Sequence, residues 1–506
     1  CYRTHHTIAM KLKLSLPIFF FLFFFLVLTL FSNLATCQEE ETDPELQTCK
    51  HQCRQQQQYS EEDKRTCMRR CDEYYETKQE REREKEKEKE QEMEEKQTHH
   101  HHHHHGKEEE KEEEEEEIPY VFEEEDFDTI HAAEGTIDVL KKFTRKSKLL
   151  QGIENFRLSF IKTRSHAFVT PRHFDSEIVL VNVVGRATIG LVMEDKTEKV
   201  NLEPGDFLRI PAGTPVYIVN RDWNDLLSLI LFHIPVSTPG HFEEFFGLGG
   251  RDPESVLTAF SWEVLEAALK TPRQKLEKLF DQQNEGSIFT ISGEEVQAMS
   301  PKKSFWPFGI QSKTPFNIFS KDPIFSNQYG SLIEVGPSDK KSELEGLNLM
   351  ITFTKIIKGS MSTILYNSHA TKIAVVIDGE GKFEMACPHV SSSHTRSKHQ
   401  KTSPSYHKIS AKLKPATVFV VPAGHPFVTI ASKKNDLKII CFEVHAEGNH
   451  KLTFAGKNNI VSALDKTAKE LAFNYPAEKV DEIFNRNEQF FFPFEEETKE
   501  NGHADA

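Results

Sequence analysis

The stretch VNLEPGDFLRIPAGTPVYIVN, residues 200–220, decides the fold class, because its short apolar runs are separated by Gly, Pro and Asp. Such runs, rich in Val and Ile and bounded by turn residues, predict β-strands. A second stretch, KLKPATVFVVPAGHPFVTI at residues 412–430, repeats the pattern. The chain is therefore expected to contain two copies of one all-β unit.

Matching glycines align the two copies. Gly185 corresponds to Gly379 with an offset of 194, and Gly213 corresponds to Gly424 with an offset of 211. The second copy therefore holds 17 additional residues between these positions. They lie most simply in the polar stretch 391–406, which we expect to be an exposed loop.

Each copy is followed by an amphipathic segment. LEAALKTPRQKLEKLF at 265–280 and KELAFNYPAEKVDEIF at 469–484 align with a constant offset of 204. Apolar residues at i, i+3 and i+4 after a proline at the first helical turn are typical of a helix with one apolar face. Each β unit is thus predicted to carry a helical arm.

The first quoted stretch resembles the second cupin motif, G-x5-P-x-G-x2-H-x3-N, but Val216 stands where metal-binding cupins have His. In the second copy Phe427 takes that place, and His173 alone survives of the H-x-H pair of the first motif. Cupin oxidases and oxygenases use three imidazoles and a carboxylate to hold manganese or iron. We interpret His173 and its neighbours Asp175 and Glu177 as polar lining or surface residues.

Taken together, these features are similar to those of the vicilins, the 7S globulins of plant seeds. The resemblance covers residues 118–495 and includes IPYVF at 118–122, both β units and both helical arms. It implies an all-β bicupin fold of two tandem jelly-roll barrels with α-helical extensions, assembled as a homotrimer through the helical arms. It also implies nutrient storage without catalysis in the protein storage vacuoles of the seed, in a family known for food allergens.

The stretch FEMACPHV, residues 383–390, departs from the repeat by its Cys and His. Some vicilins bind one copper ion through such a pair, a later histidine and an N-terminal tyrosine, and the matching residues here are Cys387, His389, His425 and Tyr120. Residues i and i+2 of a strand face the same side, and a thiolate with imidazoles suits copper. The alternative is that the cysteine is a small buried apolar residue and the later histidine a hydrogen-bonded loop residue.

Other candidate ligands have simpler interpretations. Cys441 lies in the continuous apolar run IICFEV and is expected in the core. The histidines at 369, 394, 399 and 407 are expected to face solvent.

Residues 10–37 have the pattern of a secretory signal peptide, with two lysines, an apolar run from Leu14 to Phe31 and small residues before Cys37. We expect cleavage, so that the mature chain does not associate with membranes, and residues 1–9 are then not translated. The alternative is a membrane anchor, because the run could nearly span a bilayer.

Four cysteines predict a helical hairpin over residues 45–75. Their two C-x3-C spacings place each pair on one helix face, and hairpin geometry favours Cys49–Cys71 and Cys53–Cys67 among three pairings. Zinc binding is the competing interpretation, but passage through an oxidising compartment favours disulfides. Release of the hairpin as an antimicrobial peptide or protease inhibitor is an alternative role.

Residues 76–117 are expected to form a disordered acidic linker. Between Asp72 and Asp126 there are 25 acidic and 9 basic residues, a net of −16, which equals the formal charge of the whole chain. The seven histidines at His99–His105 are interpreted as part of this linker, with loose binding of transition metals as the alternative. The remainder is nearly neutral, so that nucleic-acid binding is not expected.

The folded part is divided into an N-terminal cupin with its arm at 118–290 and a C-terminal cupin with its arm at 310–495, followed by an acidic tail at 496–506. An alternative to storage is a redox-active or metal-buffering protein that binds copper and a small apolar ligand in the C-terminal barrel. A cupin enzyme revived by manganese is a third hypothesis. The chain has no N-x-S/T sequon, so that N-glycosylation is not expected.

Overall fold

The computed structural model describes residues 118–494, apart from 195, 248, 302–313, 389–405 and 457, and also residues 65, 68 and 69. The predicted signal peptide, the two disulfides, the acidic linker, the loop at 391–405 and the acidic tail lie outside the described residues and stay predictions. Both β units belong to one compact unit, residues 114–506.

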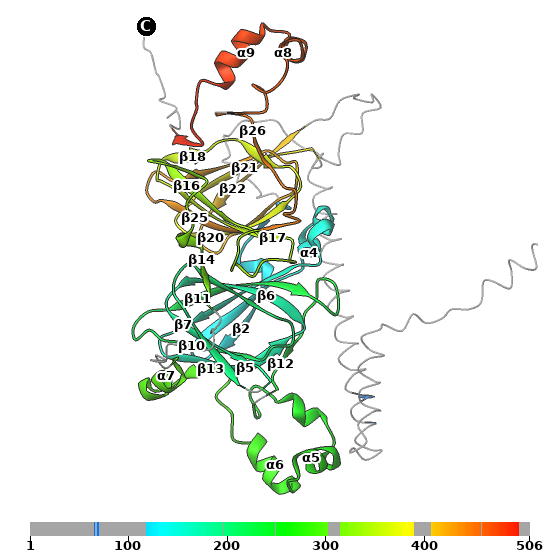
Figure 1. Ribbon diagram of the computed structural model, residues 1–506. Coiled ribbons are helices and arrows are strands. Elements are labelled where there is room, and N and C mark those ends of the chain that lie inside the picture. The colour runs from blue at the N-terminus through cyan, green and yellow to red at the C-terminus, as the bar shows by residue number, and fades with distance from the viewer. Residues whose placement is uncertain are drawn as a thin grey trace, which may run out of the picture. The chain divides into compact units, whose positions relative to one another are not determined.

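The N-terminal barrel consists of two antiparallel sheets (Figure 1). One sheet has seven strands in the order β14-β9-β6-β11-β4-β3-β2, and the other has six, β12-β5-β10-β7-β8 with β13 beside β5. The strands are β2 Phe127–Ala132, β3 Gly135–Leu140, β4 Arg157–Thr163, β5 Ala167–Phe174, β6 Ser176–Val184, β7 Ala187–Val192, β8 Thr197–Leu202, β9 Asp206–Ile210, β10 Val216–Asn220, β11 Leu227–Pro235, β12 Glu244–Phe245, β13 Ile288–Thr290 and β14 Phe316–Asn317.

The C-terminal barrel repeats this arrangement (Figure 1). Its sheets have seven strands each, β1-β23-β20-β25-β17-β16-β15 and β22-β21-β24-β18-β27 with β19 beside β24 and β26. The strands are β1 Val121–Phe122, β15 Phe325–Asn327, β16 Gly330–Val335, β17 Leu349–Ile356, β18 Ser360–Ser362, β19 Leu365–Asn367, β20 Thr371–Asp378, β21 Gly381–Cys387, β22 His407–Leu413, β23 Val418–Val421, β24 Phe427–Ala431, β25 Leu437–Val444, β26 Lys451–Thr453 and β27 Phe491–Pro493. The predicted all-β fold of two tandem barrels is confirmed.

Strand alternation sorts the side chains of β11 between two environments. Leu229 and Leu231 pack inside the N-terminal barrel, whereas Ile230 and Phe232 belong to the apolar cluster shared with the C-terminal barrel. The ring of Phe232 stacks on that of Phe442 in β25, with centroids 4.7 Å apart. Equivalent strands of the two copies therefore bury their outer faces against each other.

The predicted glycine correspondence is visible in the backbone. Gly185 and Gly379 both have positive φ, 82° and 81°, each at the turn that precedes the matching strand β7 or β21. A Cβ atom at either position would clash with a backbone carbonyl, that of Leu226 or that of Asp436. Both turns thus require glycine for the same two reasons.

The two helical arms are helix pairs related by the predicted offset. The first arm consists of α5 (Trp262–Leu269) and α6 (Arg273–Phe280), and the second of α8 (Lys466–Phe473) and α9 (Ala477–Phe484). Each first helix ends at a left-handed residue, Lys270 or Asn474. The other helical segments described within residues 118–494 are α4 Phe143–Lys146, α7 Gly293–Met299 and the 3-10 turns Glu124–Asp126, Lys148–Ile153, Val256–Ala259 and Ile318–Ser320.

Two short strands are exchanged between the barrels. β1, which we assigned by sequence to the N-terminal unit, pairs with β23 of the C-terminal barrel, and β14 pairs with β9 of the N-terminal barrel. The exchange buries the ring of Phe122, whose centroid lies 5.5 Å from that of Phe143, and packs the ring of Phe316 against that of Phe207, 5.3 Å away. Within the described ranges no helix is long and apolar enough to cross a membrane.

Candidate functional site

Tyr120 and Cys387 meet inside the C-terminal barrel. Tyr120 Oη lies 3.4 Å from Cys387 Sγ, and the two residues are 1% and 0% exposed. The strand exchange holds the tyrosine there, because Val420 N donates a hydrogen bond to Tyr120 O at 2.8 Å. Burial, together with the contact to the thiol, raises the pKa of the Tyr120 phenol. The phenol is therefore neutral at neutral pH.

Strand β21 directs the cysteine inward. Phe383, Met385 and Cys387 alternate with less buried residues, so that Cys387 is the last inward-facing residue of the strand. The thiol is free and buried. Cys387, which departs from the repeat, thus lies at the end of a barrel strand and close to Tyr120, a second side chain that is capable of binding a metal.

His425 approaches the same place from the turn between β23 and β24. It is 8% exposed, and its ring centroid lies 6.3 Å from that of Tyr120. Its Nδ1 lies 3.1 Å from Ala423 O, and donation to that carbonyl leaves Nε2 as the basic nitrogen of the ring. The structure thus brings together three of the four residues predicted from the sequence.

The fourth predicted residue, His389, lies outside the described residues and stays a prediction. His407, which we expected to face solvent, is half-buried and lies directly opposite Cys387 in the β21–β22 register. Opposite residues of an antiparallel pair share a face, so that this imidazole is on the same side as the thiol. The other described histidine of this group, His369, is exposed as predicted.

Among the side chains that the structure describes, no group of three or more His, Cys, Asp and Glu could hold a metal ion. The candidate set of phenol, thiol and imidazole therefore needs Tyr120 and His389 to reach the donor number that copper sites use. Cys441 is 2% exposed within β25, in agreement with the prediction of a core residue.

Polar remnants of the cupin motif in the N-terminal barrel have structural partners. The ring of His173 stacks on that of Phe245 with centroids 4.9 Å apart. Asp175 accepts a backbone hydrogen bond at 2.6 Å, and Glu177 pairs with Arg209 at 2.8 Å. These side chains are each engaged separately, in keeping with the interpretation as polar lining residues.

A fully buried histidine was missed by sequence reasoning. His233 in β11 forms hydrogen bonds with two hydroxyls. Its Nε2 lies 2.8 Å from Ser159 Oγ and its Nδ1 lies 3.1 Å from Ser176 Oγ, and one of the two nitrogens donates while the other accepts. The ring of Phe242 stacks on it at 4.0 Å. Burial, and then the positive charge of Arg157, lowers the pKa of His233 to about 3. Its only sequence signal is one imidazole within the apolar run LILFHIP.

A buried carboxylate occupies the matching position in the C-terminal barrel. Glu443 in β25 is 0% exposed, and its two oxygens lie 2.7 Å from Lys372 Nζ and 2.8 Å from Lys451 Nζ. Lys451 also pairs with Glu334. Burial alone would raise the pKa of Glu443, but the two ammonium groups more than offset it and hold this pKa at about 2. The cluster is an internally paired ionic network.

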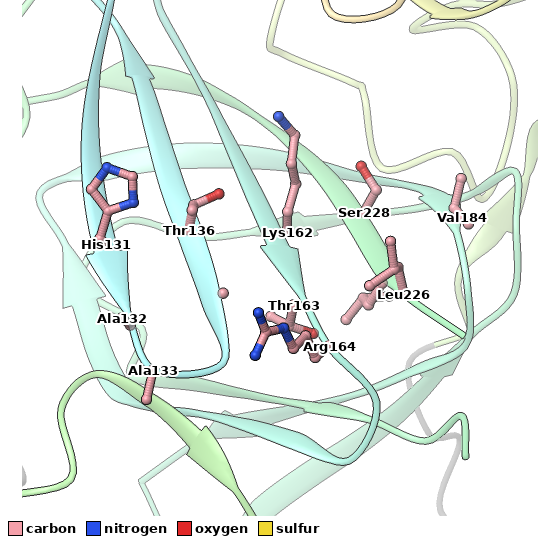
Figure 2. A pocket seen from close by; sticks show the side chains of 12 residues that line it. His131, Ala132, Ala133, Thr136, Lys162, Thr163, Arg164, Val184, Leu226 and Ser228 are labelled. Carbon is pink, nitrogen blue, oxygen red and sulfur yellow. The ribbon is translucent and has the colours of Figure 1, made fainter. Parts of the chain in front are cut away.

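The ionic network borders the place where cupins bind a metal. Lys372 Nζ lies 5.8 Å from the ring centroid of Phe427, the residue that replaces the motif histidine. In the N-terminal barrel, a cavity of about 10 Å³ beside Val216 holds at most about one water molecule. A larger hollow of about 520 Å³ lies on the outer face of β2, β3 and β4 (Figure 2), and a second of about 450 Å³ lies beside it.

Comparison with known proteins finds relatives that have the same fold. The model of the Cupin family matches residues 316–481. A sucrose-binding protein of Glycine max is 62% identical over 99% of this chain and 100% of its own length, and a vicilin of Juglans regia, Jug r 6.0101, is 49% identical over 89% of this chain and 91% of its own. The crystal structure of the vicilin from Corylus avellana superposes with a TM-score of 0.69 at 51% identity, covering 75% of this chain and all of that one.

Proposed function

The chain belongs to the vicilin family of cupin proteins, and from this premise we propose that it is a storage globulin of the seed, held in protein storage vacuoles and without catalytic activity. Its similarity to vicilins over most of its length carries this proposal. His233 is hydrogen-bonded to two serine hydroxyls and Glu443 is ion-paired with two lysines, as a structural role requires. Immunoblots should show accumulation during seed filling and loss during germination, and persistence into the seedling would contradict storage.

We also propose that the C-terminal barrel binds one copper ion per subunit. The contact of Tyr120 with Cys387, with the ring of His425 beside them, supports this assignment, and His389 would complete the set. Bound copper would supply a redox-active centre. Within the chain, β1 positions the phenol, β21 the thiol, and the hydrogen bond to Ala423 O orients the imidazole.

Replacing Cys387 by alanine is expected to remove the copper from the purified protein, because copper prefers a thiolate over the remaining neutral donors. Cys441→Ala is the matched control, since it deletes the other buried thiol of the same barrel. Metal analysis of both variants after removal of loosely bound ions provides the measurement. Wild-type protein without stoichiometric copper, or equal loss in the two variants, would overturn the assignment.

The helical arms support a homotrimer. Their surface presents large apolar side chains, among them Leu471 at 79%, Ile483 at 64% and Leu279 at 61% exposure. Several exposed apolar side chains of this size on one helix pair are typical of a protein–protein contact surface. We propose that each arm packs on a neighbouring subunit.

The double variant Leu471→Glu/Ile483→Glu is expected to yield monomers, because two carboxylates would be buried in the subunit contact at a cost of several kcal/mol each. Light scattering after size-exclusion chromatography measures the mass. Glu478→Lys on the same arm changes charge without removing an apolar side chain and should leave the assembly intact. Trimers of the double variant at micromolar concentration would refute the arm contact.

A second candidate function is the binding of sucrose or a related neutral sugar. It is favoured by the 62% identity, over the whole length, to a protein named for sucrose binding. Calorimetric titration of the full chain with sucrose tests it directly, and the absence of binding at millimolar sugar would reject it.

A further inference from the structure

We propose that neutral sugars bind in a groove on the outer face of the N-terminal barrel, an inference that rests on the second candidate function above. The outer groove consists of two adjoining hollows, one of about 520 Å³ and one of about 450 Å³. Both volumes lie within the range of small-molecule sites, roughly 300 to 1,000 Å³. The two hollows share His131, Thr136 and Lys162 and therefore adjoin each other along this row of side chains.

Strand register builds the floor of the outer groove. Thr136 of β3 lies opposite both His131 of β2 and Lys162 of β4, and Lys162 in turn lies opposite Ser228 of β11. Directly opposite residues share a face, so that an imidazole, a hydroxyl, an ammonium and a second hydroxyl form one row across four strands. Figure 2 shows His131, Thr136, Lys162 and Ser228 projecting from these strands on the same side. Such a row offers fixed donors and acceptors at the spacing of adjacent strands.

A second row on the same face lies two residues further along each strand. Thr129, Asp138 and Phe160 are opposite one another on β2, β3 and β4 and line the smaller hollow. Thr129 donates to Asp138 Oδ1 at 2.9 Å, and the ring of Phe127 lies 5.5 Å from that of Phe160. The groove thus combines a carboxylate and hydroxyls with aromatic surface, which matches a sugar ring that has hydroxyls at its rim and C–H groups on its faces.

Charge balance in the groove favours a neutral ligand. The three cations that line it each have a carboxylate partner: Lys162 with Asp138 at 2.9 Å, Arg164 with Glu134 at 3.8 Å and Lys414 with Glu123 at 3.4 Å. An anion would have to compete with these carboxylates, whereas a hydroxyl can donate to the carboxylate and accept from the cation of the same pair. The site therefore fits a polyol better than it fits a phosphate or an organic acid.

The duplicated fold contains its own control surface. The matching row of the C-terminal barrel holds Ser331 opposite Lys355 and Lys355 opposite Lys438, so that a lysine replaces Ser228. Lys355 and Lys438 pair with Asp436 and Asp378 at 3.3 and 2.8 Å. A substitution at Lys355 therefore repeats the chemistry of one at Lys162 outside the groove.

The test is a calorimetric titration of the full chain with sucrose in four forms: wild type, Lys162→Ala, Thr136→Val and Lys355→Ala. Loss of a charged or hydroxyl hydrogen-bond partner should weaken sucrose binding by about tenfold or more in the two groove variants. Lys355→Ala should bind like the wild type, and thermal unfolding of all four should coincide within a few degrees. A parallel titration with inorganic phosphate should give no competition.

The outcomes separate the two levels of the proposal. If wild-type protein fails to bind sucrose, the sugar-binding function and the groove assignment both fail. If wild type binds and the groove variants bind equally well, the function stands and the location is wrong. Displacement of sucrose by phosphate would overturn the assignment of the groove to neutral ligands.

Discussion

Replacing Lys372 by methionine is expected to lower the free energy of unfolding by about 3–5 kcal/mol, the usual effect of removing one partner of a buried ion pair. Lys372 and Glu443 are both buried, with 2.7 Å between Nζ and Oε1. Without the lysine, Glu443 keeps only Lys451, which it shares with Glu334. Urea unfolding followed by circular dichroism at fixed protein concentration gives the measurement.

Two controls separate the effect of leaving Glu443 without its buried partner from the effect of replacing a lysine in general. Lys438→Met removes an exposed pair with Asp378 in the same barrel, 2.8 Å long, and should cost no more than about 1 kcal/mol. The double variant Lys372→Met/Glu443→Met should recover most of the loss, because Lys451 then retains Glu334. If Lys372→Met costs no more than Lys438→Met, the network does not carry the stability assigned to it.

The second large effect is a loss of stability in mild acid that is due to His233. The folded-state pKa of this histidine is about 3, below its ordinary value of 6.5, because of burial. Its stabilising contribution is therefore fully present above pH 6.5 and is lost as the pH falls towards 3, since only the unfolded chain takes up the proton. Between pH 7 and pH 4 the loss amounts to about 3 kcal/mol.

Comparison of wild type with His233→Gln isolates this contribution. Glutamine can bond to Ser159 and Ser176 but does not titrate, so that the variant should lose about 3 kcal/mol less than the wild type over the same pH interval. Thermal melts at each pH provide the values. His369→Gln, at an exposed histidine, should follow the wild type. Parallel pH profiles for wild type and His233→Gln would show that the imidazole is not the group responsible.

The repeated architecture could be predicted because short sequence patterns indicate it. Turn glycines such as Gly185, the spacing of apolar residues and the proline before each second arm helix repeat at measurable offsets. The buried charges could not be predicted this way. Lys372 looks like an ordinary strand-edge residue, and only the register of β20 against β25 places it opposite Glu443.

The candidate metal site was predicted in part for the same reason. Cys387 departs from its repeat partner and was found from the sequence, together with Tyr120 and His425, through family resemblance. The position of His407 depends on the pairing of β21 with β22 across an insertion, which no local pattern reveals. The outer groove likewise arises from register, because its polar residues come from separate strands that each look like an ordinary amphipathic strand.

The exchange of β1 and β14 determines how the protein should behave when proteolysis begins. Breaking the chain between residues 301 and 314 would leave β14 on the fragment that carries the C-terminal barrel and β1 on the fragment that carries the N-terminal one. Each fragment would still be paired with a strand of the other, and the stacked rings of Phe232 and Phe442 would remain buried between them. A nicked molecule should therefore migrate as one particle in native gels and separate only in denaturant, so that digestion can start without releasing soluble pieces.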